Sequence, residues 1–233
     1  HYAGWQVQPN APSVQATLEV ALSTILREKI DITGCGRTDA GVHARFYVAH
    51  FDAPSLPPRF LNSLNSLLPE DVAVHDIRPV QPEAHARFDA YERSYMYHFS
   101  LRKDPFSTET AWHYPLHGRL EFSKMQEVAA LLPHYSAFFP FCKTDSGLEH
   151  YNCELKAAFW EKCPDEHQWI FHITANRFLR GMVRLIVGAC VQVGRGQLQV
   201  ADVQAALDEQ KPLKKSLSAP PQGLFLTDVK YPF

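Results

Sequence analysis

Strand-type and helix-type patterns occur in both halves of this 233-residue chain without a strict strand–helix–strand repeat. The clearest strand pattern covers residues 91–101, where alternation places Tyr95, Tyr97 and Phe99 on one face. The clearest helix pattern has apolar residues at helical spacing: Phe178, Met182, Leu185, Ile186, Ala189 and Val193. Because both types occur in each half without regular alternation, the sequence predicts an α+β fold.

Shorter patterns predict the remaining elements. Ser13 is placed to cap a helix whose apolar stripe is Val14, Leu18, Ala21, Leu22 and Ile25. Ser123 and Gln126 have the spacing of a capping box that opens a helix ending at Leu132. Further helices are predicted around residues 60–68 and 203–207. Further strands are predicted at residues 30–35, 42–51, 72–80, 155–160, 169–174 and 224–231.

Composition excludes several classes of protein. A chain that is 45% hydrophobic and 21% charged is neither disordered nor collagen-like. With 23 Lys and Arg against 25 Asp and Glu, the net charge of −2 excludes a polycation, although a local basic patch would suffice to bind nucleic acid. No apolar run reaches the roughly 18 residues of a membrane span.

The cysteines and the first residue bear on location and on the ends of the chain. Five widely spaced cysteines, without an export signal, predict reduced thiols and a cytoplasmic protein. Residue 1 is His rather than Met, so we expect a short segment to precede it.

The segment from Gly34 to Ala44 is the most unusual part of the chain, with three glycines in eight residues. Its spacing lacks the Lys of a phosphate loop and the third Gly of a dinucleotide fingerprint. Two interpretations of Asp39 remain open. It either bonds its own backbone in a turn or is held on a rigid loop as a nucleophile or base.

Arg177, Arg180 and Arg184 are predicted to share one face of the second-half helix, at about 100° per residue. A solvated polar face is the ordinary explanation. The alternative is a row of guanidinium groups facing RNA phosphates, with one arginine able to pair with a carboxylate.

Four potential zinc ligands also occur close together: His150, Cys153, Cys163 and His167. The residues between the two pairs resemble a strand rather than a tight turn, and Leu155 and Trp160 give them a packing role. We therefore expect no metal site.

At this point several motifs match a known family. Gly36-Arg37-Thr38-Asp39-Ala40-Gly41-Val42-His43-Ala44 resembles the signature of the tRNA pseudouridine synthase A family. Four further segments resemble that family in order: Tyr2–Gln6, Phe88–Tyr97, Phe178–Gly188 and Ala219–Leu226. The resemblance covers nearly the whole chain. The main departure is His134, where the family usually has Asp.

The resemblance implies isomerisation of uridine to pseudouridine in the anticodon stem-loop of tRNA, without metal or organic cofactor. It implies Asp39, Arg184 and Tyr95 as the catalytic residues, because a guanidinium beside a carboxylate favours its ionised form. RNA-binding residues would be Arg37, Tyr95, Arg177, Arg180 and Leu226. Family members act as homodimers, so a homodimer with tRNA as its partner is expected.

The resemblance also implies two related halves, each with a largely antiparallel sheet and helices on one face, joined into one extended sheet with a central catalytic cleft. Residues 1–85 would carry the Asp39 loop, and residues 86–233 the tyrosine strand and the arginine helix. Two other hypotheses stay open from the residues themselves. One is an RNA-binding module without catalysis, and the other is an N-glycosidase that releases free uracil.

Overall fold

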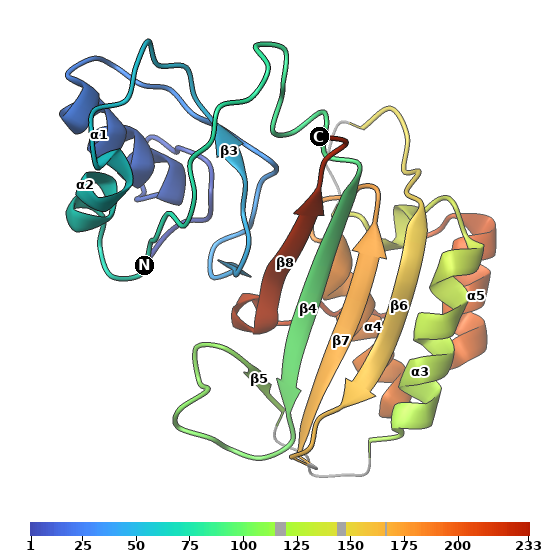
Figure 1. The fold of residues 1–233 in the computed structure, drawn as a ribbon. Coiled ribbons are helices and arrows are strands. Elements are labelled where there is room, and N and C mark those ends of the chain that lie inside the picture. The colour runs from blue at the N-terminus through green and yellow to red at the C-terminus, as the bar shows by residue number, and fades with distance from the viewer. Residues whose placement is uncertain (115–119, 144–147, 166) are drawn as a thin grey trace. The chain divides into compact units, whose positions relative to one another are not determined.

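The computed structural model describes residues 1–114, 120–143, 148–165 and 167–233. Contacts between residues divide the chain into two compact units (Figure 1). The N-terminal unit comprises His1–Gly41, Tyr47–Ala90 and Tyr231–Phe233, and the C-terminal unit comprises Val42–Phe46 and Tyr91–Lys230. Both contain helices and strands, so the predicted α+β class is confirmed.

The N-terminal unit packs two helices and a small sheet around one apolar cluster. Helix α1 (Val14–Leu26) and helix α2 (Phe60–Leu67) accompany the antiparallel strands β1 (Thr33–Gly34) and β3 (Ala49–His50). The predicted cap is confirmed, because the Ser13 hydroxyl accepts the Ala16 N–H at 3.2 Å. The core of this unit is formed by Trp5, Ala21, Leu22, Ile30, Ile32, Phe60, Leu64 and Leu68.

The C-terminal unit is built on a mixed sheet in the order β2-β8-β4-β7-β6, with β5 also paired to β4 (Figure 1). The pairs β2–β8 and β4–β5 are parallel, and the other pairs are antiparallel. Its strands are β2 (His43–Ala44), β4 (Glu92–Ser100), β5 (Trp112–His113), β6 (Leu155–Lys162), β7 (Gln168–Ala175) and β8 (Leu224–Lys230).

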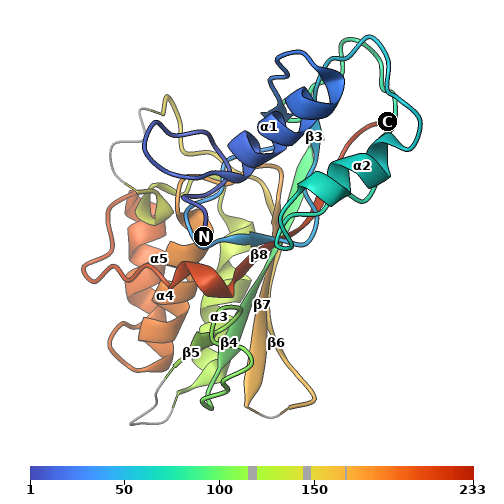
Figure 2. The ribbon, with the colours of Figure 1, turned by 90° about the vertical axis from the view of Figure 1, so that its left-hand side faces the viewer.

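Three helices cover one face of this sheet: α3 (Phe122–Leu131), α4 (Met182–Gly194) and α5 (Val200–Glu209) (Figure 2). Every residue of α4 except Arg184 is buried, which makes α4 the central helix of this unit's core. Short 3₁₀ turns occur at Leu132–His134, Phe139–Phe141 and Pro221–Gly223. Within the described ranges, no helix is long and apolar enough to cross a membrane.

Two predicted strands are wrong. Residues 42–51 do not form one strand, because β2 pairs with β8 in the C-terminal unit and β3 pairs with β1 in the N-terminal unit. Residues 72–80 form no strand. There, the Asn65 side-chain amide bonds both the N–H and the carbonyl of Val74, at 2.8 and 2.7 Å, and so replaces a strand partner.

The predicted capping box at Ser123 and Gln126 is also wrong. Helix α3 begins at Phe122 after Glu121, and Gln126 accepts the Trp160 N–H at 2.7 Å instead of closing a capping box with Ser123. A capping box does occur at α5, between Gln199 and Asp202.

Gly188 allows a close approach between α4 and the segment before β8. A Cβ atom placed on Gly188 would lie 1.8 Å from the Leu217 carbonyl oxygen. Two residues further along, the Ala219 N–H donates to the Arg184 carbonyl at 2.9 Å. The absence of a side chain at Gly188 therefore lets this segment pack directly on the helix that carries Arg184.

We predict that Gly188→Ala lowers the free energy of unfolding by about 2 kcal/mol or more, because backbone must move to admit the methyl group. The matched control is Gly36→Ala, since a Cβ there meets nothing within 4 Å. Urea denaturation monitored by circular dichroism measures both variants. Equal midpoints for the two would contradict the close approach.

Candidate active site

Asp39 lies on an irregular loop between β1 and β2, in the N-terminal unit. Its side chain is half-buried, whereas Arg37 is exposed on the same loop. The loop ends in a turn at Gly41, whose φ of 75° lies in the left-handed region that glycine adopts without strain. The loop therefore holds a carboxylate and a guanidinium two residues apart in regions of different exposure.

Trp5 and Tyr47 support this loop through two hydrogen bonds and the stacking of their rings. The Trp5 N–H donates to the Thr38 carbonyl at 3.4 Å, and the Tyr47 hydroxyl donates to the Gly36 carbonyl. The rings of Trp5 and Tyr47 stack with their centroids 4.0 Å apart. The backbone is thus held on both sides of Arg37, in the loop that carries the Asp39 carboxylate.

Gly4 explains why the first motif of the chain accompanies the Asp39 motif. Its φ is 101°, and an added Cβ would lie 2.2 Å from the Thr38 carbonyl oxygen. The motifs in the sequence do not by themselves predict these roles for Gly4, Trp5 or Tyr47. For Gly4 and Trp5 the sequence does carry a signal, because both belong to the Tyr2–Gln6 motif.

Tyr95 and Tyr97 on strand β4 differ in burial. Tyr97 is fully buried, its hydroxyl donates to the Pro220 carbonyl at 2.8 Å, and burial raises its pKa above the ordinary range. Tyr97 is therefore a core residue. Tyr95 is only half-buried and meets the Phe178 ring edge-on at 5.1 Å.

A register shift places Tyr95 beside Leu226. The pairing of β4 with β8 is irregular between Ser94 and Tyr95, after which Tyr95 is paired with Leu226. A bulge of this kind changes the direction of the side chain that follows it. Leu226 is 2% exposed, and its carbonyl accepts the Arg45 N–H at 2.8 Å. The structure thus brings these two predicted site residues together.

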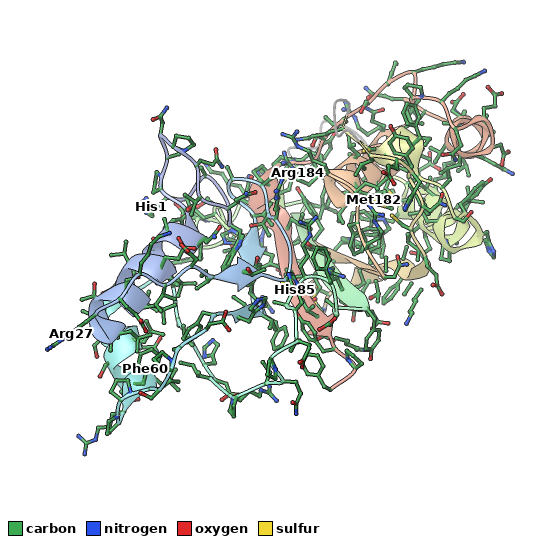
Figure 3. All side chains as sticks on the ribbon, turned by 90° about the horizontal axis from the view of Figure 1, so that it is seen from above. His1, Arg27, Phe60, His85, Met182 and Arg184 are labelled. Carbon is green, nitrogen blue, oxygen red and sulfur yellow. The ribbon has the colours of Figure 1, made fainter. Side chains whose placement is uncertain are left out.

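Arg184 lies in the first turn of α4, two residues after Met182, and both residues are labelled in Figure 3. Its Nε donates to the Ala219 carbonyl at 2.7 Å. Together with the bond from the Ala219 N–H to the Arg184 carbonyl, this contact is reciprocal. The Nε of the guanidinium is therefore tied to the segment before β8, on a helix whose other residues are all buried.

The prediction of an arginine face on one helix is wrong. The helix starts only at Met182, after Gly181 with a φ of 71°, so Arg177 and Arg180 precede it in an irregular segment. Arg180 is exposed, and its carbonyl accepts the Lys143 N–H at 3.0 Å. Arg177 is half-buried and contacts the His150 ring nitrogen at 3.5 Å.

The four candidate zinc ligands lie in the C-terminal unit. Burial raises the pKa of the Cys153 thiol to about 11, and it also raises the pKa of Cys163. Both shifts disfavour the thiolate that zinc requires. Among the described residues, no three His, Cys, Asp or Glu side chains are grouped so as to hold an ion. The absence of a metal site stays a prediction.

Comparison with known proteins identifies the family. A family model described as tRNA pseudouridine synthase matches residues 134–232. A tRNA pseudouridine synthase A from Bacteroides fragilis is 45% identical over 100% of this chain and 92% of its own length. The one from Porphyromonas gingivalis is 44% identical, over 99% of this chain and 92% of its length. The one from Pelodictyon phaeoclathratiforme is 40% identical, over 99% and 94%. Identity at this level along the whole chain confirms the resemblance found in the motifs, and the chain belongs to the tRNA pseudouridine synthase A family.

Proposed function

We propose that this chain converts uridine to pseudouridine in the anticodon stem-loop of tRNA, with the Asp39 carboxylate as its catalytic group. Membership of the family makes the chain an isomerase that acts on tRNA. In the reaction the N1–C1′ bond breaks, the uracil turns, and a C5–C1′ bond forms. The hydrogen lost from C5 is balanced by one gained at N1, so no oxidant or reductant is needed.

The supported loop is the observation that carries the assignment of Asp39. The Trp5 N–H and the Tyr47 hydroxyl donate to the carbonyls of Thr38 and Gly36, on either side of Arg37. Gly4 lets the chain approach the Thr38 carbonyl. Catalytic groups need such support, since small displacements cost large factors in rate. A carboxylate that only closed a surface turn would not need this packing beneath it.

The course of the chain supports a site shared between Asp39 and the C-terminal sheet. Ala44, which pairs with Leu226, follows Asp39 by only five positions. Five residues span at most about 18 Å. Leu226 is in turn paired with Tyr95. The tether limits how far the carboxylate can lie from the strand position where the uracil is proposed to bind.

Arg184 is proposed to pair with Asp39 and to aim it. Its Nε bond to the Ala219 carbonyl restrains the guanidinium, and a planar fork can bind both oxygens of a carboxylate. Such a partner would orient the carboxylate while the RNA brings phosphates close to the site. In this proposal the Asp39 carboxylate oxygens take part in the reaction, and Arg184 positions them.

The remaining residues are proposed to bind the substrate. The target base must leave the RNA stack, which costs a few kcal/mol. Tyr95 would stack on the uracil, with Leu226 packed beneath it, and Arg37 would hold the flipped nucleotide. Arg177 and Arg180, on the segment before α4, would contact phosphates. Such contacts make binding depend on salt.

The finer architecture is also a proposal. Two related halves, residues 1–85 and 86–233, would join their sheets around a central cleft, and two chains would form a homodimer in the cytoplasm. The presence of a sheet in each unit is consistent with this arrangement. Analytical ultracentrifugation tests the dimer, and a monomer at micromolar concentration would refute it.

Two alternatives differ in their products. An RNA-binding module would bind the stem-loop and release nothing, whereas an N-glycosidase would release free uracil. The supported Asp39 loop argues against a pure binder, because a carboxylate opposes phosphate binding. Chemical derivatisation of the RNA, followed by mapping of the modified position, separates pseudouridine from both alternatives.

We predict that Asp39→Asn abolishes catalysis, with a loss on the order of a thousandfold or more, because the amide keeps the shape but not the charge. Tritium release from C5-labelled uridine in an anticodon stem-loop measures the rate, and filter binding checks that affinity changes little. The matched control is Asp31→Asn, an exposed acid paired with Lys29 in the same unit. Full activity of Asp39→Asn would refute the catalytic role.

We predict that Arg184→Lys loses most of the activity while tRNA affinity changes little, because lysine offers a point charge and no planar fork. Arg102→Lys serves as the control, since Arg102 is exposed and pairs with Asp165 at 3.5 Å. The same assays apply, with thermal denaturation to verify folding. Near-normal turnover by Arg184→Lys would exclude the orienting role.

A further inference from the structure

We propose that Phe88, together with Arg87, forms a second RNA contact on which an unpaired base of the tRNA stacks. The inference rests on the proposed function only for the identity of the RNA. It concerns a loop that none of the assigned site residues occupies: residues 84–90 of the N-terminal unit, which contain His85 as labelled in Figure 3.

Phe88 is an aromatic side chain held in solvent. It is 73% exposed, and its ring lies 4.2 Å from the His85 ring at an interplanar angle of 30°. The Arg87 guanidinium lies 5.6 Å from the centre of the Phe88 ring. An exposed aromatic ring with a guanidinium beside it offers a surface on which a base can stack.

Hydrogen bonds fix the loop that presents this ring. The Nδ1 atom of His85 accepts the N–H groups of Arg87 and Phe88, at 3.1 and 3.2 Å. The Asp89 carboxylate accepts the His85 N–H at 2.7 Å, and the Asp89 N–H donates to the His85 carbonyl. Phe88 is therefore preorganised, which lowers the entropy lost when a partner stacks on it.

Two further residues anchor the same loop from outside. His50 accepts the Ala86 N–H at its Nδ1 atom at 3.0 Å, and the Tyr231 hydroxyl donates to the Ala86 carbonyl. Burial and the neighbouring His85 lower the pKa of His50, which favours the neutral ring that can accept this bond. The loop is thus tied to β3 and to the end of the chain.

The charge of the loop favours RNA over an apolar partner. Arg87 adds a cation beside the ring, while the only acid among residues 84–90, Asp89, accepts a hydrogen bond from the backbone. An aromatic ring with an adjacent guanidinium is the combination that binds unstacked bases in single-stranded RNA. A protein partner would instead call for a broader apolar surface around Phe88.

The test compares Phe88→Leu, Phe88→Trp and the control Phe106→Leu for binding to unmodified tRNA. Phe106 is 99% exposed and lies in the C-terminal unit, so it matches Phe88 in type and exposure. We expect Phe88→Leu to weaken binding about tenfold, and Phe88→Trp to bind within about twofold of the parent, since stacking depends on the ring. Phe106→Leu should bind as the parent does.

Binding is measured in the Asp39→Asn background, so that no turnover occurs, and at several salt concentrations. Phe88→Leu should shift the affinity equally at all salts, whereas Arg87→Ala should reduce the salt slope by about one. Unchanged affinity of Phe88→Leu overturns the proposal. So does equal weakening by Leu and Trp with a lowered melting temperature, which indicates a structural role. A parent protein that binds tRNA but makes no pseudouridine refutes the proposed function alone.

Discussion

The short crossing of the chain at Val42–Phe46 is the constraint on which the proposed site depends. These residues belong to the C-terminal unit, while the residues on both sides of them belong to the N-terminal unit. Strand β2 pairs in parallel with β8, and the Arg45 N–H donates to the Leu226 carbonyl. The loop that carries Asp39 therefore leads directly into β2, which pairs with β8 at Leu226, and Leu226 is in turn paired with Tyr95.

Backbone carbonyls accept the hydrogen bonds that hold the Asp39 loop and Arg184. The Asp39 loop is supported at Thr38 and Gly36, and Arg184 is bonded to Ala219 through both its backbone and its side chain. Glycine makes these approaches possible at Gly4 and Gly188. Contacts that place these groups before the substrate arrives reduce the entropy that must be lost on binding.

The local patterns predicted part of this arrangement. Ser13 as a cap follows from its residue type at the start of an apolar stripe. The shared face of Tyr95 and Tyr97 and the apolar stripe of α4 follow from periodicity. Both kinds of signal depend only on nearby residues. The predictions failed where a distant partner decides the outcome. Asn65 replaces a strand partner for Val74, and residues 42–51 divide between two sheets. The start of α4 at Met182 depends on the conformation of Gly181, which hydrophobic spacing does not reveal.

The most direct test of the central claim is a crystal structure of the chain bound to an anticodon stem-loop. The account predicts that the target uridine is out of the RNA stack beside Tyr95, with a carboxylate oxygen of Asp39 within about 4 Å of the Arg184 guanidinium. A uridine that remains stacked in the RNA, or an Asp39 carboxylate well beyond that distance from Arg184, would contradict it.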